Sequence, residues 1–287
     1  MIAARRMLRP QIGAVLAVAL AACGKSGPKV ALRFHPPAGA VYHYALEQHS
    51  KIKFEGGPTA AMGEQQLTMR MYFTQEVGTP AGGKIQVTMT FDSISAESPM
   101  MPRAMMEQTF QQMRGMKSTV IYDDQMRVQQ MHFSGAPGMP AQMSDEITSS
   151  FKNLAFPFPD HPVGPGDSWD VQMELPMGNL PGAGPIRTST KVTVRDIQVS
   201  GADTTVRLGV ETTFPKDPVT VPAQGQTVEL RFAGTMTGEQ VFSLRQGAPV
   251  QTTMGGTIHM EMKGPALGTQ TMAMSMEQQA TMKMTEH

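Results

Sequence analysis

The sequence predicts a mainly β fold: a curved antiparallel sheet or an open barrel of many strands, with two inserted helices. Three observations lead to this prediction. Long segments alternate apolar and polar residues, as a strand with one buried face does. Glycine and proline separate these segments at regular intervals. Two segments between residues 100 and 154 instead repeat their apolar residues with the period of a helix.

The first half of the body begins with a short strand expected over 31–34. The segment 41–54 alternates most clearly, with Tyr42 and Tyr44 on one face and His43 on the other. Consecutive hairpins should make these strands antiparallel. Further strands are expected over 65–77, 84–94, 118–122 and 125–133, and the helices over 102–113 and 140–154.

The second half begins at a glycine turn followed by Trp169, much as the first begins at a glycine turn followed by Tyr42. We interpret this likeness of 31–155 and 156–287 as a distant internal duplication, although any two antiparallel meanders would look similar. The two halves could fold as one unit or as two. Strands are expected over 169–175, 187–199, 204–214, 226–232, 235–244, 250–263 and 269–284.

The N-terminus has the three parts of a secretory signal. Arginines come first, an apolar run over 12–20 follows, and small residues precede the only cysteine. The segment Leu20-Ala21-Ala22-Cys23 resembles the lipobox of bacterial lipoproteins. The resemblance implies that 1–22 is removed, that Cys23 is acylated, and that 23–30 is a lipidated tether. The alternative is an ordinary signal peptide with Cys23 incidental.

The resemblance also implies a location in the cell envelope. In the sorting rule of that family an aspartate after the cysteine retains the protein at the inner membrane, and Gly24 stands there instead. This favours the outer membrane, facing the periplasm. Acidic and basic residues balance at 24 each, and no long basic run exists, which argues against a nucleic-acid partner.

A second stretch, over 156–169, resembles an uncharacterised strand-rich lipoprotein family that shares a Pro-Val-x-x-Gly-Asp-x-Trp pattern. The resemblance implies no activity. From the residues themselves, Gly166 and Asp167 are expected to form a turn. Trp169 is expected to be a structural anchor of the core rather than a surface for stacking a ligand.

Methionine is the outlier in composition, with 27 residues. Thioethers are soft ligands that suit Cu(I), and a metal site is therefore an alternative hypothesis for residues Met260, Met262, Met272, Met274 and Met276. Methionine also fills irregular cores and adaptable apolar cavities. The excess is spread over the whole chain, which favours the apolar interpretation.

The motifs of common hydrolases and of phosphate-binding loops are absent from the sequence. We therefore predict no enzyme and no cofactor. The expected function is a membrane-anchored binding or structural module of the envelope, whose partner is a hydrophobic ligand or an envelope protein. A methionine-rich Cu(I)-binding protein is the alternative, and an unrecognised hydrolase is a third hypothesis.

Overall fold

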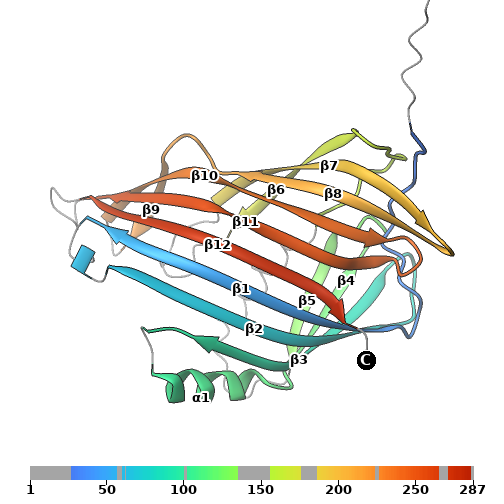
Figure 1. Ribbon diagram of the computed structural model, residues 1–287, viewed down its shortest axis with the longest axis horizontal. Helices are drawn as coiled ribbons and strands as arrows, with labels where there is room; N and C mark the ends of the chain where they lie inside the picture. The colour runs from blue at the N-terminus through green and yellow to red at the C-terminus, as the bar shows by residue number, and fades with distance from the viewer. Residues whose placement is uncertain are drawn as a thin grey trace, which may run out of the picture.

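The computed structural model describes residues 27–56, 60–61, 63–99, 102–134, 156–175, 186–223, 226–264 and 271–285. These residues form one open antiparallel sheet of 12 strands, which confirms the predicted β fold (Figure 1). The elements are β1 (Val41–Glu55), β2 (Glu64–Val77), β3 (Ile85–Glu97), α1 (Arg103–Met113), β4 (Lys117–Tyr122), β5 (Val128–Ser134), β6 (Ser168–Leu175), β7 (Ile186–Ser200), β8 (Asp203–Thr213), β9 (Val219–Ala223), β10 (Gln226–Ser243), β11 (Ala248–Lys263) and β12 (Met272–Thr285).

The chain enters the sheet at its centre. The strand order is β5-β4-β3-β2-β1-β12-β11-β10-β8-β7-β6, with β9 paired to β10. The chain therefore runs from β1 outward to the edge strand β5, restarts at the opposite edge with β6, and returns until β12 pairs with β1. Both predicted halves belong to this single sheet.

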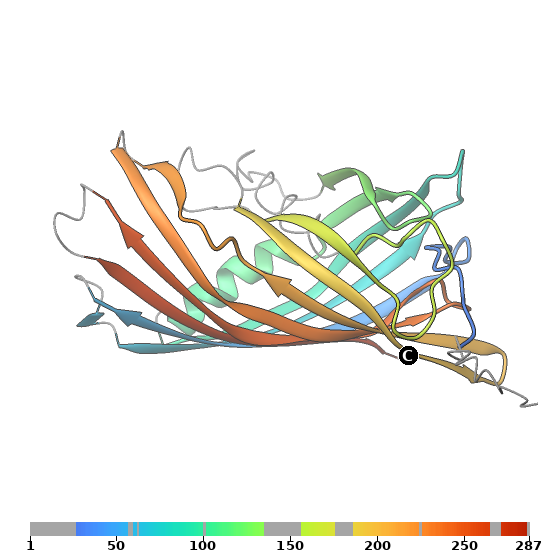
Figure 2. The same ribbon diagram turned by 90° about the horizontal axis from the view of Figure 1, so that it is seen from above.

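The sheet is strongly curved, so that it has a concave and a convex face (Figure 2). The helix α1 runs along β3, which it contacts. Within the described ranges, this short helix and every other helical segment fall short of the length and apolarity needed to cross a bilayer.

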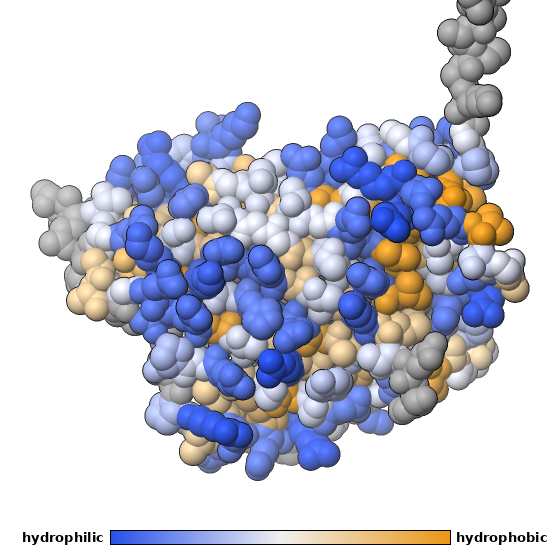
Figure 3. Space-filling view, in the orientation of Figure 1, coloured by the Kyte–Doolittle hydropathy of each residue, from blue (hydrophilic) through white to orange (hydrophobic). Residues whose placement is uncertain are grey.

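Charge separates the two faces. In the twelve described strands the pairing register places every charged side chain on the convex face, and the concave face carries apolar residues with some Gln, Ser, Thr and Gly. Ion pairs such as Arg70–Glu47, at 3.2 Å, cross strands on the convex side. Figure 3 shows this face as largely hydrophilic.

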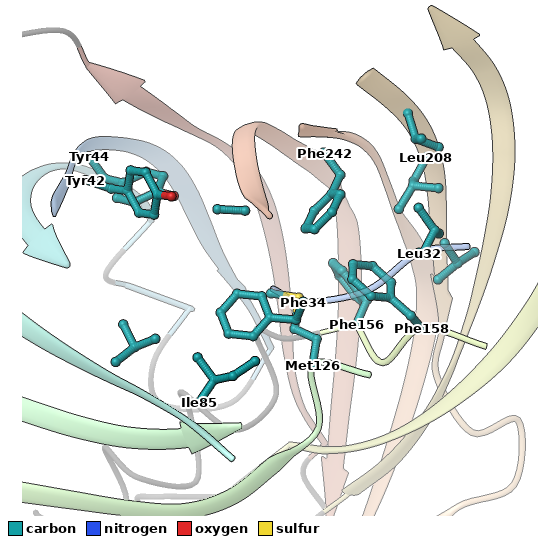
Figure 4. Packing of buried hydrophobic residues seen from close by; sticks show 14 of the residues in the cluster. Leu32, Phe34, Tyr42, Tyr44, Ile85, Met126, Phe156, Phe158, Leu208 and Phe242 are labelled. Atoms are coloured by element: carbon teal, nitrogen blue, oxygen red, sulfur yellow. The ribbon is translucent and has the colours of Figure 1, made fainter. Parts of the chain in front are cut away.

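The main core fills one end of the concave side (Figure 4). Phe34, from the segment before β1, and Phe158, from the connection before β6, lie over the sheet there. The rings of Phe158 and Phe242 meet edge to face with centroids 4.9 Å apart. The buried hydroxyl of Tyr44 donates to the carbonyl oxygen of Pro249 at 2.9 Å, and burial raises the pKa of this tyrosine far above its ordinary value.

The structure differs from the expected elements at three places. The segment 31–34 is not a strand, because it crosses the concave side and packs into the core. Leu32 is buried there, and the Phe34 amide donates to the Asp124 carbonyl oxygen at 2.8 Å. The strands expected over 226–232 and 235–244 are one strand, β10, which continues through Gly234 at φ 114°. The short strand β9 was not expected.

The remaining helical prediction, over 140–154, lies outside the described residues. The expected helix over 102–113 is present as α1. The Asp123 carboxylate holds the hairpin turn between β4 and β5, since it accepts hydrogen bonds from the amides of Gln125 and Arg127 at 3.0 and 2.8 Å.

Phe158→Ala tests whether the connection before β6 holds the core. Its side chain is 1% exposed, so truncation should lower the free energy of unfolding by ~3–5 kcal/mol. The measurement is urea denaturation followed by circular dichroism. Val199→Ala is the control, because Val199 is 75% exposed and its loss should change stability little. Equal effects of the two substitutions would contradict the assigned core.

Candidate functional site

The predicted lipobox, Leu20, Ala21, Ala22 and Cys23, lies outside the described residues. The described part of the predicted tether, 27–30, lies against the body. Val30 and Val163 exchange two backbone hydrogen bonds of 2.8 Å, and Lys29 Nζ lies 3.0 Å from Asp167 Oδ2. Only 24–26 then separate Cys23 from the docked chain, a link of at most ~14 Å when extended.

The residues of the Gly-Asp-x-Trp stretch hold this docking point together. Gly166 turns the chain at φ 92°, and Asp167 Oδ2 accepts a hydrogen bond from the Gly164 amide at 2.9 Å. That bond and the Lys29 ammonium lower the pKa of Asp167 below its ordinary value. Trp169 packs on the core and its indole N–H donates to the Pro157 carbonyl oxygen at 2.9 Å.

Beyond the main core, the concave face continues over the far halves of β1, β10, β11 and β12. We call this part the methionine trough. Its side chains face each other in rows across the paired strands, with neighbouring Cβ atoms ~4.5–5.5 Å apart. The trough comprises Ile52, Phe54, Phe232, Met236, Met254, Ile258, Met260, Met262, Met272, Met274 and Met276.

Side chains of the methionine trough are partly exposed, whereas concave residues at the core end are buried. For example, Met274 and Ile258 retain solvent contact, but Leu208 and Phe242 are 0% exposed. Covering an uncharged, partly exposed apolar surface with hydrocarbon is favourable, because it removes that surface from water. The trough is therefore the candidate functional site.

The structure brings together the five methionines of the copper hypothesis. Met260 lies opposite Met274 and Met262 lies opposite Met272 in the register of β11 and β12, with Met276 on the same face. His259 lies on the convex face, so it does not join them. No group of three or more His, Cys, Asp or Glu side chains suited to a metal was found among the described residues.

Glycines opposite methionines form a feature of the trough that sequence reasoning missed. Gly238 pairs with Met254, and Gly256 pairs with Met236. Met254 Sδ lies 2.6 Å and Met236 Sδ 3.1 Å from where a Cβ would stand on the opposite glycine. Each flexible thioether thus lies over a backbone position without a side chain. Glycine at an inward position of an alternating strand was the available signal.

A separate pocket of about 370 Å³ lies at the rim near the core end, between the start of β1 and the end of β12. Its lining mixes residues of both faces, including Val41, His43 and Met284, and none of them belongs to the methionine trough. This pocket is open and half polar, so it presents less apolar surface to a hydrocarbon ligand than the trough does.

Gly238→Ala tests the close approach of β10 and β11. The added Cβ would collide with the Thr253 carbonyl oxygen and with Met254, so we expect a loss of ~1–3 kcal/mol in stability. Thermal unfolding measures it. Gly255→Ala is the matched control, because its Cβ would approach only to 3.4 Å of the Gln278 carbonyl oxygen. If Gly238→Ala left the stability unchanged, β10 and β11 would have to lie farther apart than in this structure.

Comparisons with known proteins assign no family. No family model and no curated protein matches the sequence. Six solved chains match, among them one from a structure described as "lipid-protein interactions in lipovitellin", with a TM-score of 0.49 and 10% identity over 88% of this chain and 26% of that chain. This chain thus spans about a quarter of the lipovitellin chain's length. At that identity and TM-score the likeness does not indicate a ligand or a family.

Proposed function

We propose that this protein is a non-enzymatic lipoprotein of the bacterial envelope that binds the hydrocarbon part of a ligand in the methionine trough. The observation that carries the proposal is the uncharged concave face, whose side chains are buried at the core end and partly exposed in the trough. A face built only to complete a core would be covered throughout, as it is near Phe242.

The physical chemistry of the trough suits a hydrocarbon chain. Covering apolar surface contributes ~25 cal/mol per Å², so an alkyl chain laid along several methionines would bind without any specific polar contact. Methionine side chains are unbranched and polarisable, and they adapt to ligands of varied shape. An ionised group placed there would lose its hydration without a counter-ion.

The proposed lipid anchor at Cys23 would set where the protein lies in the cell. Acylation of Cys23 with more than one chain would hold the protein stably on a bilayer. Because Lys29 and Val30 are docked on the body, the curved sheet would stay close to the lipid surface. Such a position suits a protein that exchanges an apolar ligand with a membrane, and we place it on the periplasmic side of the outer membrane.

Met274→Glu tests binding in the trough. A ligand that covers Met274 would have to desolvate the new carboxylate, so the dissociation constant of the neutral dye Nile red should rise at least ~10-fold. The measurement is a fluorescence titration of the full chain carrying Cys23→Ser, in detergent-free buffer. Ser275→Glu, on the convex face beside Lys53, is the control and should bind normally. Equal binding by the two variants would refute the trough as the site.

The same material separates the alternatives by native mass spectrometry. A retained mass of lipid size supports the proposal. A stoichiometric copper adduct after Cu(I) addition, lost when Met260 and Met274 are replaced by Leu, would favour the metal hypothesis instead. Bare chain mass together with failed dye binding would leave an envelope protein as the partner.

Cys23→Ser tests the anchor. The unchanged chain should incorporate labelled palmitate in bacterial cells, because acylation needs the thiol, and the variant should incorporate none. Autoradiography of the purified protein gives the result. Palmitate labelling that survives the substitution, or an unchanged chain whose mass shows cleavage without acylation, would overturn the lipoprotein assignment and leave an ordinary secreted protein.

A further inference from the structure

An amide on the concave face is buried without a full set of hydrogen bonds. Gln240, on β10 at the boundary of the main core and the methionine trough, is 3% exposed. Its Nε2 donates to Thr252 Oγ1 over a long 3.4 Å, and its Oε1 has no hydrogen-bond partner among the described residues. Turning the amide over would pair the oxygen and leave the nitrogen unpaired instead. Either orientation leaves one polar atom unpaired.

Buried side-chain polar atoms are nearly always hydrogen-bonded in folded proteins, because an unpaired one loses hydration and gains nothing in return. Another concave amide near the trough has a local partner: Gln48 Nε2 donates to Ser50 Oγ at 3.2 Å. Gln240 combines burial with an unpaired oxygen at the edge of the trough, and a ligand group is a partner that its position allows.

The space beside Gln240 can open without breaking the sheet. The next inward residue on the same strand is Gly238, which has no side chain, and the flexible Met254 lies over it. A rotamer change of Met254 would expose the glycine backbone, two residues along β10 from Gln240. The trough and the amide would then form one continuous surface.

The charge pattern restricts the group that Gln240 could meet. The concave faces of the described strands carry no Lys, Arg, Asp or Glu, so an ionised head group would find no counter-ion there. A hydroxyl or an amide is neutral, and it can donate to Oε1 as well as accept from Nε2.

We propose that Gln240 hydrogen-bonds a neutral hydroxyl or amide group of the ligand, so that the trough selects neutral amphiphiles, such as long-chain alcohols, glycerides or N-acyl amides, over pure hydrocarbons. This inference rests on the proposed function, because it names the ligand class of the same site.

The test compares two displacers of Nile red that differ in one hydrogen-bond donor, hexadecan-1-ol and hexadecyl methyl ether. On the Cys23→Ser chain the alcohol should bind ~10-fold more tightly than the ether, as expected for one buried hydrogen bond to an otherwise unpaired group. In Gln240→Met, a near-isosteric change, this ratio should fall to about 1. Gln279→Met, on the exposed convex face of β12, should keep the ratio.

A thermal melt of the ligand-free proteins distinguishes ligand recognition from a structural role. The substitution removes a buried amide with an unpaired atom, so the melting temperature of the Gln240→Met variant should equal or exceed that of the protein with Gln240. A clear drop would show that Gln240 has a structural partner and would overturn the inference.

The binding outcomes separate the two proposals. If alcohol and ether displace the dye equally from the unchanged protein and Gln240→Met weakens the binding of neither, or if Gln240→Met keeps the preference for the alcohol, the inference fails while hydrocarbon binding stands. If neither compound displaces the dye and the dye itself does not bind, the proposed function fails.

Discussion

The pairing of β1 with β12 is the interaction on which the rest of the structure depends. It joins the first strand of the chain to the last over 13 residue pairs, from His43 with Thr285 to Glu55 with Ala273. Without it the molecule would be two separate meanders, each with an open edge on the inner side. With it, the strands form one continuous curved sheet, and both halves contribute to a single concave face.

A sheet of this width needs something to cover its concave face, and the chain supplies cover at one end. The segment before β1 and residues 156–167 before β6 cross that end, where Phe34, Phe158 and Phe242 pack together. Farther along, methionines facing Gly238 and Gly256 fill part of the space. Because thioether side chains are flexible and uncharged, this region can rearrange around hydrocarbon at little cost to the sheet. The same composition serves both packing and the proposed binding.

The copper hypothesis and the hydrocarbon hypothesis start from the same residues. Met260, Met272 and Met274 gather on one face because strands alternate their side chains and β11 pairs with β12. That gathering does not itself favour a metal, since Ile52, Phe54 and Ile258 lie in the same rows. A face that mixes thioethers with branched and aromatic hydrocarbon is a poor donor set for an ion and a good surface for an alkyl chain.

The sequence by itself indicated most of the strands, because the alternation of apolar and polar residues shows which side of a strand is buried. It also indicated the turn at Gly166 and Asp167, since those residues carry their own turn chemistry. Only the tertiary structure decided the register. It placed the segment 31–34 inside the fold instead of in the sheet, merged β10 through Gly234, and set Gly238 opposite Met254. The unpaired amide of Gln240 could not be found from sequence either. Whether a glutamine has a partner depends on which side chains neighbouring strands bring beside it, and those strands are set by pairing between residues far apart in the chain.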